Sequence, residues 1–157
     1  MNFPRPILSL ALILLCTAGR LGAQEPAATA APEATEQIKT VLTEQAAAWN
    51  AGDVDRFMQG YAKSPDLRFA SGGNVTYGWQ ATLDGYKKRY PDRKAMGALT
   101  FSELDVKVLS ADAALVFGRW RLVTGKQTPN GLFTLLFRRT PDGWRIVADH
   151  TSLAAER

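Results

Sequence analysis

His150 is the residue of this sequence whose side chain is best suited to acid–base chemistry. It is the only histidine. Its ordinary pKa lies near neutrality, so it could act as a general base, a general acid or a hydrogen-bonding group for a ligand. An equally open interpretation is that His150 is half-buried and purely structural, with a backbone carbonyl or a tyrosine as its hydrogen-bond partner. Strand alternation places His150 on one face with Trp144 and Ile146, which we predict to be the inner face of a sheet.

Aromatic residues are the second group of candidate site residues. At least one of Tyr86 and Tyr90, which lie one helical turn apart, is predicted to offer a hydroxyl group to a ligand oxygen. Tyr61 and Trp49 are interpreted as core residues instead. The predicted ligand-binding residues are therefore Trp79, Tyr86, Tyr90, Trp120, Phe137 and His150.

Carboxylates are weak candidates for the same chemistry. Asp66 lies in a turn, Asp84 lies off the apolar line of its helix, and Asp149 alternates to the outer face of the last strand. A mechanism that needs an inward carboxylate is therefore not predicted. With one histidine and no close acidic cluster we expect no metal site, and no cofactor is expected.

Helices and strands must position these residues. Apolar residues at helical spacing predict helices over 34–50, over a short stretch after residue 53, and over 80–90. The basic run 87–89 is interpreted as a solvated face of the third helix. Alternation and turn residues predict a short hairpin within 67–77 and strands from 99 to 152. Helices first and a meander last indicate an α+β fold with an antiparallel sheet.

The N-terminus has the features of a cleavable secretory signal over residues 1–23. Arg5 precedes an apolar run over 7–16, and small residues lead to a predicted cleavage after Ala23. Residues 24–33 are rich in Ala and Pro and are interpreted as a flexible linker. Because Cys16 is the only cysteine, the mature domain would have none. We expect a secreted or periplasmic protein with no membrane contact after signal removal.

The charge of the chain is modest. Lys and Arg number 19, Asp and Glu number 15, and the formal net charge is +4. The basic residues are scattered rather than gathered on one face, so nucleic acid is not an expected partner.

Three segments in order resemble the nuclear transport factor 2-like superfamily, in its SnoaL-like and ketosteroid-isomerase-like branches. They are residues 49–57 (WNAGDVDRF), residues 78–90 from Gly-Trp-Gln to the second tyrosine, and residues 142–152 (DGWRIVADHTS). The last segment is also similar to the calcium/calmodulin-dependent protein kinase II association domain. Over 34–157 the resemblance implies one domain. In it a cone-shaped, curved antiparallel sheet of about four long strands plus a short hairpin wraps around three N-terminal helices, and its open end forms a pocket.

The resemblance also bears on assembly. Members of the family commonly pair their sheets in a dimer. The predicted outer face carries Phe117, Val123, Leu132 and Leu136, which would benefit from such cover. We therefore predict a homodimer formed through the outer sheet face.

Three functions remain open at this point. The first is a pocket protein that binds a small, mostly apolar organic molecule, with His150 and a tyrosine at its polar end. The second is an isomerase, cyclase or hydrolase that uses His150 as acid–base. The third is a dimerisation module without a ligand, for which a fully packed interior is expected.

Overall fold

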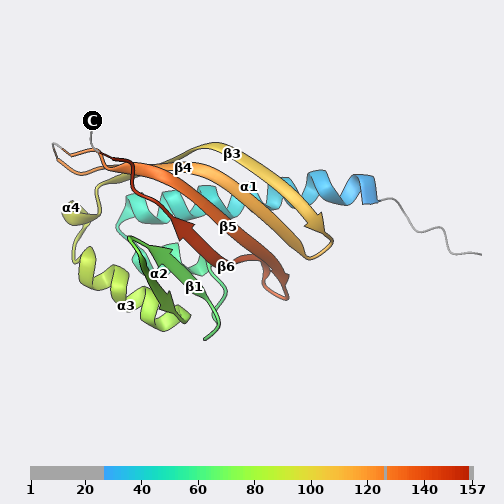
Figure 1. The fold of residues 1–157 in the computed structure, drawn as a ribbon, viewed down its shortest axis with the longest axis horizontal. Coiled ribbons are helices and arrows are strands. Elements are labelled where there is room, and N and C mark those ends of the chain that lie inside the picture. Colours follow the sequence, from blue (N-terminus) through green and yellow to red (C-terminus); the bar gives the residue numbers. More distant parts are fainter. Residues whose placement is uncertain (1–26, 126, 156–157) are drawn as a thin grey trace, which may run out of the picture.

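The computed structural model describes residues 27–125 and 127–155, so the predicted signal over 1–23 lies outside the described residues. Figure 1 shows the helices preceding and flanking a curved sheet. In chain order the elements are α1 (Ala27–Ala51), α2 (Val54–Phe57), η1 (Met58–Gly60), β1 (Arg68–Ser71), β2 (Asn74–Tyr77), α3 (Trp79–Arg89), α4 (Arg93–Met96), β3 (Ala98–Ser110), β4 (Ala113–Val123), β5 (Asn130–Thr140) and β6 (Gly143–Thr151).

The strands form one sheet in the order β2-β1-β6-β5-β4-β3. The four long strands pair antiparallel, as predicted, but β1 runs parallel to β6 and makes the sheet mixed. The parallel pairing begins before β1, where Tyr61 forms a bridge to Ile146 and the amide of Ala62 donates to the carbonyl of Ile146 at 2.9 Å. The chain thus enters the sheet alongside β6 in the same direction. The predicted α+β class with a curved sheet is confirmed, and the wholly antiparallel sheet is corrected.

The first helix starts earlier than the sequence pattern indicated. It begins at Ala27, so residues 27–33, which we predicted to be a linker, are helical. Alanine has the best intrinsic helix propensity, and this segment is rich in it. Pro32 lies inside the helix. The absence of apolar periodicity over 24–33 therefore misled the prediction.

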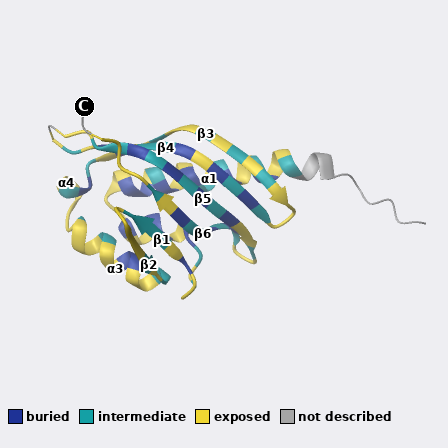
Figure 2. Cartoon of the chain, viewed as in Figure 1, coloured by how far each residue is buried: buried dark blue, intermediate teal, exposed yellow. Residues whose placement is uncertain are grey.

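The concave face of the sheet packs on α1, and this contact is the core. Burial alternates along the long strands, as the striped colouring of Figure 2 shows. The fully buried side chains include Ile38 and Leu42 on α1 and Val116 and Phe137 on β4 and β5. On the outer face Phe117 remains 42% exposed. The outer positions predicted for Phe117, Val123, Leu132 and Leu136 are thus confirmed, because each of them alternates with buried residues of its strand.

The C-terminal end of α1 is tied to the start of β3. The indole Nε1 of Trp49 donates to the carbonyl of Met96 at 2.8 Å. The side chain of Asn50 accepts from the amide of Leu99 at 2.7 Å and donates to its carbonyl at 2.9 Å. Asn50 therefore imitates a neighbouring strand, and Trp49 is held on the cavity side of the helix. The short α4 that carries Met96 was not predicted. No helix within the described ranges is long and apolar enough to cross a membrane.

Candidate functional site

A cavity of about 130 Å³ lies between the concave face of the sheet and the helices α1, α2 and α3. Most of its wall is aromatic or aliphatic. The aromatic residues that line it are Trp49, Phe57, Tyr61, Phe69, Tyr86, Tyr90, Phe101, Trp120 and Phe133. A wall of this kind suits an apolar ligand, and the few polar groups in it decide how that ligand is oriented.

The aromatic wall is built around Trp49. Its ring lies edge-on to Tyr90, Phe57 and Tyr86, with centroid separations of 4.8, 5.1 and 5.8 Å. Edge-to-face packing at these separations is favourable beyond the apolar area that it buries. Because the hydrogen bond to Met96 also fixes the indole, contacts within the protein hold this side of the cavity in place.

A carboxyl group, that of Asp149, lies in this wall. Asp149 is 6% exposed. Its Oδ2 accepts a hydrogen bond from the hydroxyl of Tyr61 at 2.8 Å, and its Oδ1 accepts one from the hydroxyl of Thr151 at 2.7 Å. Both donors also line the cavity. The arrangement is therefore a buried acid held by two hydroxyl groups at the edge of an apolar space.

A β-bulge in β6 places Asp149 there. Leu136 pairs with Ala148, but the next residue of β5, Phe137, pairs with Ile146, so Val147 is an extra residue in β6. An inserted residue reverses the alternation of every residue beyond it. Trp144 and Ile146 point inward as predicted. After the bulge the inward positions are Asp149 and Thr151.

The same bulge overturns the prediction for His150. Its side chain is exposed, and it does not line the cavity. The alternation that we extended through β6 was wrong from Val147 onward, so His150 is not a candidate for chemistry in the cavity. Asp149, which the same alternation placed outside, takes that position.

Burial controls the acidity of the groups in the cavity. Burial raises the pKa of Asp149 from 3.8 to about 6, while the hydrogen bonds from Thr151 and Tyr61 favour the charged form. Burial, followed by the negative charge of Asp149, raises the pKa of Tyr61 and of Tyr86 well above 10.0. At neutral pH Asp149 is therefore mostly ionised and able to accept a proton, whereas both tyrosines keep their protons and can donate hydrogen bonds.

The other predicted ligand-binding residues divide into two groups. Tyr86, Tyr90 and Trp120 line the cavity. Trp79 does not: its indole donates to the carbonyl of Met58 at 2.9 Å, and Lys63 lies over its ring at 5.4 Å. Phe137 is completely buried in the core and does not line the cavity, whereas Phe133 and Leu135 on the same strand do.

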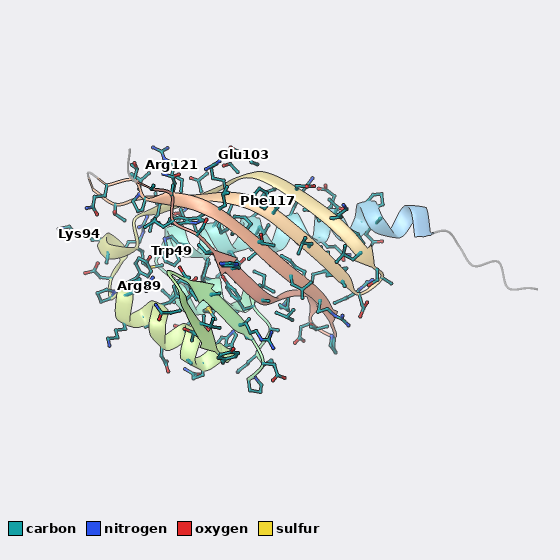
Figure 3. The ribbon with its side chains drawn as sticks, viewed as in Figure 1. Trp49, Arg89, Lys94, Glu103, Phe117 and Arg121 are labelled. Atoms are coloured by element: carbon teal, nitrogen blue, oxygen red, sulfur yellow. The ribbon has the colours of Figure 1, made fainter. Side chains whose placement is uncertain are left out.

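Four polar residues of the wall were missed besides Asp149, namely Gln45, Ser71, Arg89 and Thr151. Gln45 on α1 is buried, lines the cavity and donates to the carbonyl of Phe57 at 3.1 Å. Arg89 at the end of α3 also lines the cavity, although the run 87–89 was interpreted as solvated. The helical spacing from Tyr86 to Arg89 was a usable signal, because residues three apart are neighbours on a helix surface. In Figure 3 Trp49 and Arg89 lie at the same end of the molecule, beside α3 and α4.

The described part of the chain contains no group of three or more His, Cys, Asp or Glu side chains that could hold a metal ion. The carboxyl of Asp149 and the hydroxyl groups of Tyr61 and Tyr86, which line the cavity, are groups that can transfer protons and form hydrogen bonds.

Comparison with known proteins agrees with this geometry. Residues 38–156 match the SnoaL-like domain family. An NTF-2 like protein from Shewanella oneidensis MR-1 is 45% identical, with a TM-score of 0.73, and the alignment covers 75% of this chain and 98% of that one. No curated protein gives a significant match.

More distant solved structures share the fold. A cystatin-like fold protein from Burkholderia xenovorans is 21% identical with a TM-score of 0.63, over 80% of this chain and 95% of that one. A ketosteroid isomerase-like protein from Erwinia carotovora atroseptica is 18% identical with a TM-score of 0.63, over 77% and 96%. The family match over most of the folded domain and the close relative agree, and the chain belongs to the SnoaL-like domain family, within the NTF2-like fold.

Proposed function

We propose that this protein binds a small, mostly apolar organic molecule in its cavity and exchanges a proton with it through Asp149. The observation that carries the proposal is the buried carboxyl of Asp149 in a largely aromatic wall. A carboxyl whose pKa is raised toward neutrality inside a cavity is suited to take up and return a proton. A purely structural core would gain more from an apolar side chain at this position.

The cavity limits the size of the molecule. Its volume is about 130 Å³, and an apolar cavity of about 150 Å³ in another protein holds benzene. The enclosed part therefore accommodates one ring or a chain of similar bulk. A larger substrate would have to extend through the mouth of the cavity.

The polar groups support abstraction of a proton next to a carbonyl. The C–H bond breaks, the proton forms an O–H bond with Asp149, and the electron pair moves onto the carbonyl oxygen. Tyr86 lines the same cavity and keeps its proton, so its hydroxyl can donate a hydrogen bond to that oxygen. Return of the proton from Asp149 regenerates the carboxylate.

One observation favours a second function, binding without turnover. Both carboxyl oxygens of Asp149 already accept hydrogen bonds from side chains of the protein. Asp149 would then fix the polar end of a ligand instead of reacting with it. The cavity disfavours the third hypothesis, because a dimerisation module without a ligand is expected to have a fully packed interior.

Hydrogen–deuterium exchange tests the proposal. Cyclohexanone in deuterated buffer exchanges the protons next to its carbonyl, and NMR follows the rate. We expect the protein to accelerate this exchange, with a rate that rises with pH around a midpoint near 6 as Asp149 ionises. Asp149→Asn should lower the acceleration by about a hundredfold or more.

Asp66→Asn is the matched control, because it makes the same change at an exposed turn residue that does not line the cavity. It should leave the exchange rate unchanged. Binding of cyclohexanone without accelerated exchange would favour the second function. Equal rates for the wild type and Asp149→Asn would refute the role of Asp149.

The place where the protein acts is part of the same proposal. The predicted signal over 1–23 would send the folded domain out of the cytoplasm. The expected homodimer also remains a proposal, which the exposure of Phe117 (42%) and Val123 (36%) on the outer sheet face supports.

A further inference from the structure

Arg89 places a positive charge at the mouth of the cavity. It is the last residue of α3, it is exposed, and its side chain lines the cavity. Arg89 forms no ion pair with any residue in 27–125 or 127–155, whereas Lys87 on the same helical turn pairs with Asp55 at 2.8 Å. A guanidinium that faces an apolar cavity without a carboxylate partner is available to a ligand.

The negative charge of Asp149 and the positive charge of Arg89 lie in different parts of the cavity wall. Asp149 raises the pKa of Tyr86, and Arg89 lowers it, so Tyr86 lies within reach of both charges. Asp149 is buried and Arg89 is exposed, and both line the cavity. The cavity therefore has an anion in its inner wall, a cation at its rim and aromatic rings between them. A wholly apolar ligand would make no use of the cation.

We infer that the molecule bound here is a small cyclic or aromatic carboxylic acid, whose carboxylate pairs with Arg89 while its apolar ring occupies the cavity. This inference rests on the proposed function of the same cavity. A guanidinium presents two parallel N–H donors that match the two oxygens of a carboxylate. Arg89 is the one cationic side chain among the described residues that line the cavity, which suits a single carboxylate better than a phosphate.

The pairing also fixes the direction in which the ligand lies. A carboxylate near Asp149 would meet a like charge in a desolvated space, whereas at Arg89 it meets an opposite charge next to solvent. The far side of the ring then faces Asp149 and the hydroxyl of Tyr86. A cyclic keto acid with its carbonyl opposite its carboxylate would satisfy both ends at once.

Two probes separate this inference from the proposed function. One is cyclohexanone, and the other is its carboxylic acid derivative with the acid group opposite the carbonyl. Binding is measured by NMR titration and proton exchange by deuterium incorporation. We expect the wild-type protein to bind the keto acid about tenfold more tightly than the neutral ketone, the ratio that a free energy of about 1.4 kcal/mol provides. The preference should weaken as salt is added.

Substitutions on α3 supply the comparison. Arg89→Gln should remove the preference for the acid, measured as the ratio of the affinities for the keto acid and for cyclohexanone. Lys88→Gln removes the same charge from the adjacent exposed residue, which does not line the cavity, and should keep the preference. Arg89→Lys should keep only part of it, because an ammonium lacks the planar fork.

The outcomes are distinguishable. Equal affinity of the wild type for both probes, or an equal loss of preference in Lys88→Gln, would overturn the role of Arg89 while proton exchange on cyclohexanone still supported the proposed function. Failure of the wild type to bind either probe would overturn the proposed function, and the inference about Arg89 that rests on it would fall as well.

Discussion

Replacing Asp149 by asparagine should make the folded protein more stable at neutral pH. The carboxyl is buried, and burial raises its pKa from 3.8 to about 6. Between these two pH values the folded chain keeps a proton that the unfolded chain has released. The folded state is therefore favoured most below about pH 4, and stability is lost as pH rises toward 6. Asparagine does not titrate, so Asp149→Asn should lack this loss.

The size of the effect follows from the same two values. A pKa that rises from 3.8 to about 6 corresponds to about 3 kcal/mol, since one pKa unit is 1.36 kcal/mol. Near pH 4 the variant and the wild type should have similar stability, because asparagine and a protonated aspartate are neutral and of similar shape. At pH 7.5 the variant should be more stable by about 3 kcal/mol.

Urea unfolding followed by tryptophan fluorescence measures this difference at a series of pH values. Asp66→Asn is the control, because Asp66 is exposed in a turn and its replacement should leave the pH dependence of stability as it is in the wild type. A difference between Asp149→Asn and the wild type that stays constant from pH 4 to 7.5 would refute the raised pKa. Equal or lower stability of the variant at pH 7.5 would show that the hydrogen bonds that Asp149 accepts from Tyr61 and Thr151 stabilise the wild type by more than the buried charge costs.

Two further predictions concern the scaffold and the assembly. Asn50→Ala removes both hydrogen bonds that tie α1 to Leu99 and leaves the amide and carbonyl of Leu99 without these partners. It should lower the free energy of unfolding by about 2 kcal/mol, whereas Glu44→Ala, at an exposed position of the same helix, should change it little. On the outer sheet face Phe117→Asp should convert the expected dimer to a monomer in light scattering, and a wild-type protein that is already monomeric at micromolar concentration would refute that expectation.

Most of the fold was predictable because its patterns are uninterrupted. On β4 and β5 the alternation runs without a break through the inward positions, and Val116, Leu135 and Phe137 are buried as expected. The helix that carries Tyr86 follows the same logic with a period of 3.6 residues. Regular periodicity is a physical consequence of a sheet or helix with one buried face, so it can be recognised in the sequence alone.

The functional end of β6 was not predictable in that way. The bulge at Val147 has neither a glycine nor a proline beside it, and valine itself is an ordinary strand residue. No residue next to Val147 therefore indicates that the inward and outward alternation reverses there. The error moved the prediction by one residue, from Asp149 to His150. The partner that stabilises the true orientation, Tyr61, lies 88 residues away in the sequence, and such a pairing becomes visible only in the folded chain.

The bulge in β6 is the feature that buries the carboxyl of Asp149. Without the extra residue, β6 would place Asp149 in solvent and His150 in the cavity, and the fold would avoid a cost of about 3 kcal/mol at neutral pH. The surrounding core does not need the carboxyl, because Phe133, Leu135 and Ile146 are already buried on the inner face of the sheet. Features that lower stability without serving the packing are expected where a protein performs its chemistry. If Asp149→Asn is both more stable at neutral pH and inactive in proton exchange, the carboxyl of Asp149 serves the function of the protein at the expense of its stability.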